Sequence, residues 1–285
     1  ETNVVYFSPL LESRHPVFYQ RLNDLLENIG IEHRELKYTK DYWARDYMPF
    51  QLGKDEFLKY RYYPDYLVNS KDENDKEYIT NCTKVLRGMG ISCISTDLII
   101  DGGNMVTCGP YIVMTDKVYV ENHCKKDDAE FKARLESEIG HPVIIIPWTM
   151  HGDFDVEDTD KYGHSDGFIK WCGDNRILMC NHGDEYPEEA TAIRNELEKY
   201  GFEVTEMRFN NKVASPIADL NWAYINFLQV GKHIIMPIFN IEEDSIAYNY
   251  IADAFPDCTI HQIEMAEIAE EGGALHCISW NILSE

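Results

Sequence analysis

The feature of this sequence that most restricts its fold is a helix followed by a short strand, repeated five times. The first helix begins at Pro16, carries apolar residues at helical spacing, and leads into the strand IEHREL. The first four helices end at glycines: Gly30, Gly90, Gly140 and Gly201. The fifth leads through Pro256 and Asp257 into TIHQIEM. Proline in the first turn and glycine after the last turn are typical helix boundaries, so five helices are predicted.

The spacing of these units is compatible with two architectures. The four glycines are 60, 50 and 61 residues apart, a period typical of repeated units that bury their apolar faces on one another. A doubly wound α/β sheet also alternates helices with strands and is commoner. The spacing leaves both open. Other strands are predicted at residues 4–7, 57–61, 91–95, 111–115, 118–121, 167–171, 176–180 and 233–238.

Composition limits the setting in which this chain works. It has 285 residues and no Pro/Gly/Ser-rich linker, so one domain over residues 1–285 is expected. With 26 basic against 50 acidic residues, no nucleic acid partner is expected and a small cationic substrate is compatible, although an acidic surface also serves solubility. No apolar run has the length of a membrane span, so no membrane partner is expected either.

Eight cysteines are scattered along the chain without a CxxC pair. In a chain long enough to form a core, most of them are expected to be free thiols, buried as small apolar side chains in a reducing compartment. A cytoplasmic protein is therefore predicted. No signal peptide is visible, but secretion stays open because a leader could have been trimmed before Glu1.

A polar cluster follows each of the five strands, and the first cluster is DYWARDYMPF. Trp43 and Asp46 lie three residues apart in it. A carboxylate beside an aromatic face suits a flat organic cation, because the carboxylate accepts hydrogen bonds while the ring stacks. The alternative is an Arg45–Asp46 turn with Trp43 in the core.

The second and third clusters add an acid and a histidine. Asp101 ends a strand before Gly102 and Gly103, where it is equally well explained as a site residue or as the cap of a tight turn. In GHSD, His164 and Asp166 point to the same side of an extended chain, which places an acid/base beside a cation anchor. The alternative for His164 is a hydrogen-bonded core histidine.

The fourth and fifth clusters contain AYINF and GGALHC. Asn226 is predicted within an apolar strand, where its amide needs partners from a ligand or from a neighbouring loop. Cys277 follows a glycine-rich turn that can present an exposed thiolate. A lone cysteine is more often inert packing, but a cysteine with a distant histidine is the arrangement expected for covalent catalysis.

Metal binding is a poor interpretation of the acidic segment that precedes GHSD. The acids of residues 153–158 lack the glycine and the terminal glutamate of an EF-hand at the expected offsets. His151 and His164 have no partner at the HxxxH or CxxC spacing of a zinc site. No metal ligand is therefore predicted.

A thiol, an imidazole and two or three carboxylates together suit the chemistry of a guanidinium group. A guanidinium is planar, permanently cationic and rich in N–H donors that pair with carboxylates in bidentate fashion. Its central carbon is a poor electrophile because the charge is delocalised. An enzyme that attacks this carbon must hold the group rigidly and supply a strong nucleophile, for which a thiolate is suited.

The order and separation of WARDYMPF, DGGN, GHSD, AYINF and GGALHC make most of the chain resemble the agmatine deiminase and Porphyromonas-type peptidylarginine deiminase family. This family belongs to the guanidino-group-modifying superfamily with the pentein fold. The resemblance therefore implies a five-bladed α/β propeller with pseudo-fivefold symmetry. It also implies hydrolysis of a guanidino group to a ureido group and ammonia, with no metal and no organic cofactor.

The resemblance assigns catalytic roles to the matching positions. Cys277 is expected to be the nucleophile. Asp46 and Asp166 are expected to hold the guanidinium nitrogens. His164 is expected to protonate the departing ammonia and then to activate water. Family members often form dimers, so a homodimer is a further expectation.

Substrate-binding roles are expected for four more residues. Trp43 is expected to stack against the substrate and Asn226 to line the pocket. Asp101 stands where agmatine deiminases have glutamate, and it is expected to support the substrate or the histidine. Arg61, in KYRYYPDY, either binds a substrate carboxylate or pairs with a surface acid. Agmatine is the expected substrate; the alternatives are peptidyl- or free arginine, transfer to an amine instead of water, and a non-catalytic guanidino-binding module.

Overall fold

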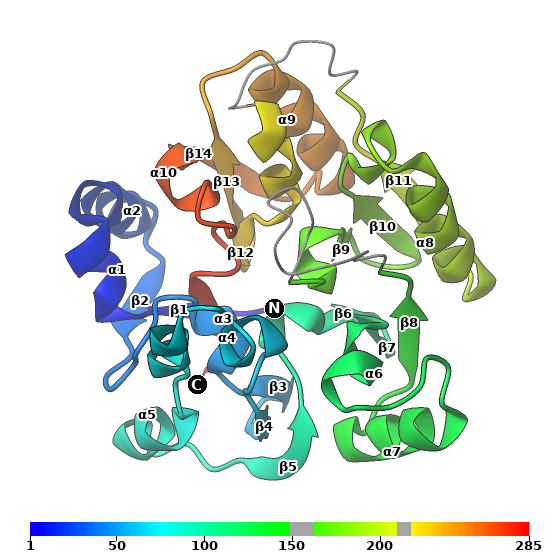
Figure 1. Ribbon diagram of the computed structural model, residues 1–285. Helices are drawn as coiled ribbons and strands as arrows, with labels where there is room; N and C mark the ends of the chain where they lie inside the picture. The colour runs from blue at the N-terminus through cyan, green and yellow to red at the C-terminus, as the bar shows by residue number, and fades with distance from the viewer. Residues whose placement is uncertain (149–161, 210–217, 285) are drawn as a thin grey trace.

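The computed structural model describes residues 1–148, 162–209 and 218–284 (Figure 1). Within these residues, five sheets contain three strands each, and the middle strand of each sheet is antiparallel to one neighbour and parallel to the other. In order across each sheet, the strands are β15 (Ser279–Ile282), β1 (Val4–Phe7) and β2 (Glu32–Glu35); β3 (Phe50–Gly53), β4 (Glu56–Arg61) and β5 (Ile94–Ile99); β6 (Val106–Cys108), β7 (Tyr111–Thr115) and β8 (Val143–Ile146); β9 (Ile169–Trp171), β10 (Arg176–Met179) and β11 (Glu203–Glu206); and β12 (Leu228–Val230), β13 (His233–Ile238) and β14 (Thr259–Glu264).

Helices connect the two parallel strands of every sheet. The α-helices are α1 (Pro9–Arg14), α2 (Pro16–Ile29), α3 (Ala44–Tyr47), α4 (Asp65–Val68), α5 (Cys82–Met89), α6 (Lys117–Glu121), α7 (Ala129–Ile139), α8 (Pro187–Lys199), α9 (Glu243–Ala254) and α10 (Ala266–Ala269). The 3-10 helices are η1 (Glu73–Tyr78), η2 (Gly102–Asn104), η3 (Ser165–Gly167), η4 (His182–Asp184) and η5 (Ala218–Ile225). Each blade is therefore an antiparallel strand pair followed by a crossover helix (α2, α5, α7, α8 or α9) and a parallel strand.

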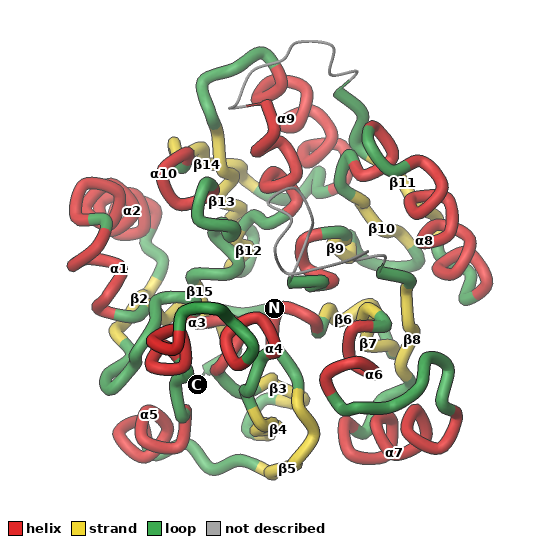
Figure 2. The backbone as a smooth tube through the Cα atoms, viewed as in Figure 1, coloured by secondary structure: helices red, strands yellow, loops and turns green. Residues whose placement is uncertain are grey.

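The five blades form a ring, with the strands inside and the crossover helices outside (Figure 2). The ring is closed by β15, which pairs with β1 from Val4 opposite Ile282 to Phe7 opposite Ser279. No sheet in the described ranges is wider than three strands, so the doubly wound alternative is excluded. The fold is the five-bladed α/β propeller that the resemblance implies.

Helix α2 shows how local sequence produces a crossover helix. Pro16 occupies the first turn, where a backbone N–H would have no helical partner. Phe18 and Leu26 lie on one face and belong to the same buried cluster as Val5 of β1. Gly30 ends the helix at φ +74°, a left-handed conformation that glycine adopts without strain. The predicted boundaries of this helix are therefore confirmed.

The predicted strand at residues 118–121 is wrong, because these residues belong to helix α6. Val118 is buried whereas Val120 is 56% exposed. In a strand the two side chains would share one face. Lys117 and Glu121, four residues apart, instead form an ion pair across one helical turn.

Two other predicted strands also differ from the structure. The strand predicted at residues 91–95 begins only at Ile94. The N–H of Ile91 is unavailable to a sheet because it donates to the carbonyl of Leu86 at the end of α5. Asn226 lies in no strand, since it follows the 3-10 helix η5 and precedes β12.

Two buried apolar clusters hold the blades together, and β1 contributes to both. Val5 and Phe7 belong to one cluster, Val4 and Tyr6 to the other, because alternate side chains of a strand point to opposite faces.

No helix in the described part of the chain has both the length and the apolar composition that crossing a membrane requires. All eight cysteines lie in that part, and none of them forms a disulfide, as their scatter predicted.

Trp280 in β15 provides a test of the ring closure. Its ring is buried 5.3 Å from that of Tyr6, and its Nε1–H donates to the carbonyl of Pro49 over 2.8 Å. Trp280→Phe leaves that carbonyl unpaired, so we expect the free energy of unfolding in urea to fall by about 1–3 kcal/mol. Trp171→Phe is the control, because its Nε1–H also donates to a carbonyl, that of Asp174, but at the surface. Equal losses in both variants would contradict a role in closure.

Candidate active site

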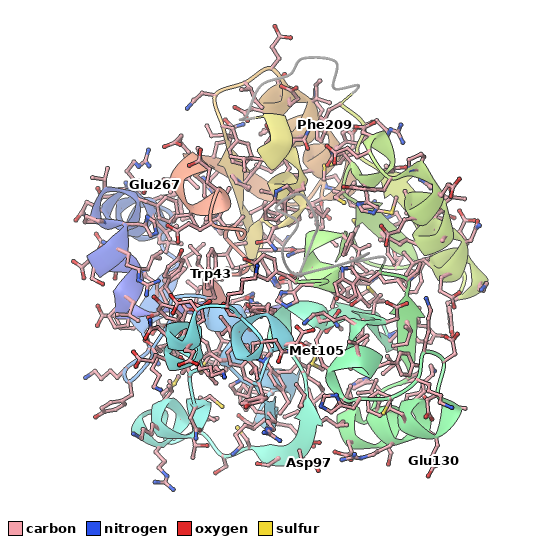
Figure 3. All side chains as sticks on the ribbon, viewed as in Figure 1. Trp43, Asp97, Met105, Glu130, Phe209 and Glu267 are labelled. Carbon is pink, nitrogen blue, oxygen red and sulfur yellow. The ribbon has the colours of Figure 1, made fainter. Side chains whose placement is uncertain are left out.

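Segments from different blades line a cavity of about 600 Å³. Trp43 and Asp46 come from the start of α3, His164 immediately precedes η3, and Cys277 precedes β15. Figure 3 shows Trp43 inside the ring, whereas Asp97 lies at its rim. Four of the residues predicted for the site therefore share one cavity wall, and Asp166 lies beside the thiol.

Backbone contacts hold Cys277 in place. Its N–H donates to Asn226 Oδ1 over 3.2 Å, and its carbonyl accepts the N–H of Arg45 over 3.0 Å. Its sulfur lies 4.0 Å from Asp166 Oδ2. Burial raises the pKa of the thiol well above its ordinary value, and the charges of Asp166 and Asp46 raise it further. Cys277 on its own is therefore a protonated thiol at neutral pH.

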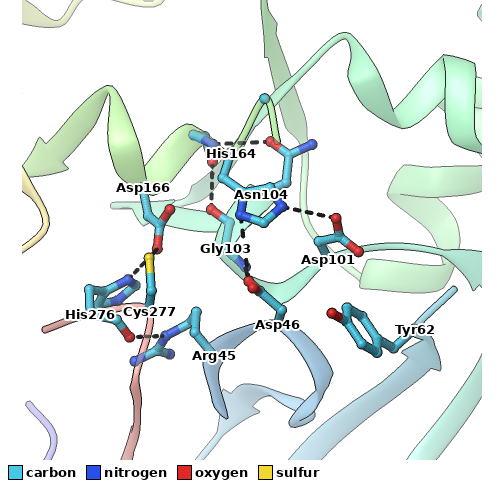
Figure 4. Close-up of polar contacts among 12 residues, drawn as sticks. Arg45, Asp46, Tyr62, Asp101, Gly103, Asn104, His164, Asp166, His276 and Cys277 are labelled. Atoms are coloured by element: carbon cyan, nitrogen blue, oxygen red, sulfur yellow. Dashed lines mark hydrogen bonds and ion pairs between the residues drawn. The ribbon is translucent and has the colours of Figure 1, made fainter. Parts of the chain in front are cut away.

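His164 lies between two carboxylates (Figure 4). Its Nε2–H donates to Asp101 Oδ2 over 2.9 Å, and its Nδ1 lies 3.6 Å from Asp46 Oδ1. Burial alone would lower the pKa of His164, but the Asp46 and Asp101 carboxylates outweigh burial and raise this pKa to about 10. The imidazole is therefore protonated at neutral pH and can act as an acid.

The two carboxylates nearest the thiol differ in their protonation. Asp46 Oδ1 accepts the N–H of Gly103 over 3.0 Å, and burial raises the pKa of Asp46 to about 7 despite the His164 charge. Burial also acts on Asp166, but the 2.6 Å hydrogen bond from His276 Nδ1 and the neighbouring positive charges of His164 and Arg45 together outweigh it and lower the pKa of Asp166. Asp166 Oδ1 is buried and has no hydrogen-bond partner in the described residues. A cationic N–H donor would satisfy this oxygen.

Gly103 explains why a glycine stands in the DGGN segment. A Cβ atom at this position would lie 2.7 Å from His164 Nδ1 and 2.8 Å from Asp46 Oδ1. The next residue, Asn104, joins the end of β7 to the start of η3, because its Oδ1 accepts the N–H groups of Thr115 and Ser165. The segment therefore brings the imidazole and the carboxylate against bare backbone.

Asp101 and Asn226, predicted to bind substrate, do not line the described cavity wall. Asp101 is fully buried behind His164, which it contacts directly. Asn226 is also fully buried, and its Nδ2 donates to the backbone carbonyl of Asp166 over 3.3 Å while its Oδ1 holds Cys277. Both residues support the cavity from behind, because buried polar groups in this layer must pair with protein atoms.

Arg61 is likewise not where its predicted role requires it. Its side chain is exposed, and its guanidinium lies 4.6 Å from the ring centre of Tyr63. The arginine in the cavity wall is Arg14, at the end of α1, 3.7 Å from Asp41. Arg14 also lies 5.2 Å from the ring centre of Tyr78. Only the folded chain brings these residues together, so no sequence signal indicated Arg14.

Sequence analysis also missed His276, although it directly precedes Cys277 in GGALHC. Burial, with the neighbouring cations Arg45 and Lys170, lowers the pKa of His276 to about 3. The ring is therefore neutral, and its Nδ1–H orients Asp166. Its position beside the predicted nucleophile was the available signal.

The described residues contain no group of three or more His, Cys, Asp or Glu side chains arranged to hold a metal ion. His151 and the acids of residues 153–158, which were considered as metal ligands, lie outside the described ranges.

The fold and the site together define a class of protein: a five-bladed propeller with a buried cysteine, a histidine and carboxylates at one central cavity. A model of the Porphyromonas-type peptidyl-arginine deiminase family matches residues 11–282, and the chain belongs to this family.

Individual relatives agree with this membership. A Legionella pneumophila protein, named as a candidate agmatine deiminase, is 24% identical over 296 residues, which cover 97% of this chain and 82% of that protein. A Vibrio parahaemolyticus protein with the same name is 35% identical over 223 residues, which cover 68% of this chain and 61% of that protein. The solved structure of C. jejuni agmatine deiminase has a TM-score of 0.74 at 18% identity, covering 100% of this chain and 94% of that one. This likeness shows the fold.

The charge of Asp166 provides a test of the state of the thiol. Asp166→Asn removes a negative charge 4.0 Å from the Cys277 sulfur and so lowers the pKa of the thiol. We expect about threefold faster alkylation of Cys277 by iodoacetamide at pH 8, since half a pKa unit changes the thiolate fraction by about that factor. Peptide mass mapping separates Cys277 from the other cysteines. Asp97→Asn, at an exposed position, is the charge-matched control; unchanged or slower alkylation in Asp166→Asn would contradict the electrostatic account.

Proposed function

We propose that this chain is a hydrolytic deiminase that converts a guanidino group to a ureido group and releases ammonia through a covalent intermediate on Cys277. The observation that carries the proposal is the unpaired oxygen of ionised Asp166 beside the thiol. Asp46 and protonated His164 line the same cavity as Cys277. Family membership supports the same class of reaction.

A guanidinium complements the charge of this site. Its planar N–H groups suit Asp166 Oδ1 and the Asp46 carboxylate, and the Trp43 ring offers a wall for the substrate. A cation bound here opposes the two negative charges that raise the pKa of Cys277. Substrate binding therefore lowers the pKa of the thiol, whose proton passes to solvent, and the thiolate forms where its electrophile lies.

The first half of the reaction forms the covalent intermediate. The thiolate attacks the guanidinium carbon, which forms a C–S bond and a neutral tetrahedral adduct. His164 transfers its proton to one nitrogen, the C–N bond breaks, and its electron pair leaves with ammonia. The remaining thiouronium cation on Cys277 keeps the two carboxylates as its counter-ions.

The second half returns the enzyme to its starting state. Neutral His164 takes a proton from water, and the hydroxide adds to the thiouronium carbon. The C–S bond then breaks with its electrons on sulfur, the O–H proton of the adduct passes to the thiolate, and the neutral ureido product forms. Ammonia takes up the proton that the thiol released to solvent. One guanidinium and one water become one ureido group and one ammonium ion.

Agmatine is the substrate we propose first. The cavity wall includes the acids Asp41 and Glu271, which suit the ammonium at the far end of agmatine. Burial raises the pKa of Asp41 to about 6, so this group is ionised above that pH. The names of the relatives favour the same compound.

Arginine, free or at the end of a peptide, is the second candidate. Arg14 lies in the cavity wall, and its guanidinium can pair with a substrate carboxylate, which agmatine lacks. A non-catalytic guanidino-binding module is disfavoured because it needs neither the thiol of Cys277 nor the acid His164.

Removal of the nucleophile tests the reaction. For Cys277→Ala we expect ureido product and ammonia to fall at least about 1000-fold with agmatine, free arginine and a peptide ending in arginine, because no covalent intermediate can form. Cys124→Ala, at a half-buried cysteine outside the cavity wall, should keep its turnover. No turnover of any of the three substrates by the unaltered protein would overturn the deiminase proposal.

Arg14 tests the choice between the two substrates. For Arg14→Ala we expect kcat/KM for free arginine to fall about tenfold, as for a lost charge-assisted hydrogen bond, while that for agmatine is kept. Arg61→Ala is the matched control, since Arg61 is exposed and lies on Tyr63. The same loss with both substrates in Arg14→Ala would exclude a carboxylate-binding role.

A further inference from the structure

Lys117 is a fully buried cation in the layer behind His164. Its side chain is 0% exposed, and its Nζ lies 3.2 Å from Asp65 Oδ1 and 3.4 Å from Asp101 Oδ2. It also pairs with Glu121 one turn along α6. Burying a lysine is unfavourable unless its partners compensate for the lost water, so this cluster contributes little stability beyond what an apolar residue would supply. Stability alone therefore does not account for it.

One oxygen connects this cation to the proposed acid. Asp101 Oδ2 contacts Lys117 Nζ and, at 2.9 Å, His164 Nε2. Burial favours the neutral form of Asp101, but Lys117 is the strongest of the opposing influences, and the pKa of Asp101 is lowered overall. Burial raises the pKa of Glu121 to about 8, whereas the pKa of Asp101 is lowered. Asp101 is therefore the anion in direct contact with the imidazole that Lys117 stabilises.

A second contact connects Lys117 to the cavity wall. Asp65 begins helix α4, and the next two residues of this helix, Tyr66 and Leu67, line the cavity. Lys117 Nζ also lies 5.0 Å from the ring centre of Tyr66. The wall and the imidazole are thus held by the same ammonium group.

We propose that Lys117 is a positioning residue: it keeps Asp101 as a carboxylate against His164 and, through Asp65, holds α4 beside the same imidazole. The role rests on the proposed function, in which His164 is the proton donor. The central test nevertheless measures the pKa of His164 directly and does not require catalytic turnover.

Removal of Lys117 has two opposed effects on His164. Lys117 repels the imidazolium directly and lowers its pKa, whereas the Asp101 carboxylate raises that pKa through a hydrogen bond and its charge. The second effect is larger because Asp101 is in contact with the ring. Without the lysine, Asp101 takes up a proton and His164 loses its anion. The other charged or titratable groups in the described residues around Lys117, Asp101 and His164 are Asp46, Asp65, Glu121, Asp166, Tyr60, Tyr62, Tyr66 and Tyr162.

The experiment is a titration of the His164 ring by ¹⁵N NMR, with the signal assigned by its absence in His164→Gln. In Lys117→Met we expect the pKa of His164 to fall by at least about one unit, the size of a lost contact with a carboxylate. Lys132→Met is the matched control, because Lys132 also pairs with a glutamate, Glu136, across one helical turn, in α7. This substitution should leave the pKa of His164 unchanged. An unchanged or higher pKa in Lys117→Met would overturn the proposal.

Asp101→Asn shows whether the effect passes through Asp101. Asp101→Asn alone should lower the pKa of His164, and adding Lys117→Met should lower it no further. Additive shifts would overturn the proposed route. If Lys117→Met does not fold, Lys117→Gln keeps N–H donors without the charge and must shift the titration in the same direction.

Turnover, where present, adds an independent measurement. The loss of kcat/KM with rising pH should begin at lower pH in Lys117→Met, because a neutral His164 cannot protonate ammonia. Asp65→Asn keeps the cation but loosens α4, so it should raise KM severalfold while leaving the His164 titration in place. If the unaltered protein turns over no guanidino substrate, the proposed function fails while the NMR titration still decides the role of Lys117.

Discussion

The pairing of β15 with β1 is the interaction on which the rest of this structure depends. It places the last strand of the chain beside the first, in one sheet with β2. Cys277 lies two residues before β15, and Trp43 and Asp46 follow β2, so the same pairing brings the proposed nucleophile to the first carboxylate. The hydrogen bond from Arg45 N–H to the Cys277 carbonyl joins the two segments. The strand pairing that closes the ring therefore also assembles the site.

The parts of the fold that could be predicted from sequence are those with local causes. Crossover helices have an apolar stripe and, in four of the five, a glycine stop, both of which are set within about four turns of chain. The antiparallel strands β3, β6 and β15, of three or four residues each, were not predicted. Residues 118–121 were predicted as a strand because valine and tyrosine favour strands, but the buried Lys117–Glu121 pair determines a helical turn.

The residues that line the cavity were predicted from the sequence, whereas the roles of the residues behind them were not. Motif positions identified the residues that line the cavity, since each follows a strand at the centre of the ring. They did not show which way a side chain points, so Asp101 and Asn226 were taken for substrate contacts although they face protein atoms. Arg14 and Lys117 belong to no motif, and their partners Asp41 and Asp101 are distant in sequence. Only tertiary packing reveals such residues.

The charge of the site also bears on the release of product. In the proposed reaction the substrate and the covalent intermediate are both cations, and each matches the carboxylates of Asp46 and Asp166. The ureido product is neutral, so it keeps hydrogen bonds to these carboxylates but loses the ionic attraction, and it binds more weakly than the substrate. Once the product leaves, the negative charges again raise the pKa of Cys277 and restore a protonated thiol. In this proposal the same two carboxylates select the cation, activate Cys277 when the cation is bound, and favour release when the charge is gone.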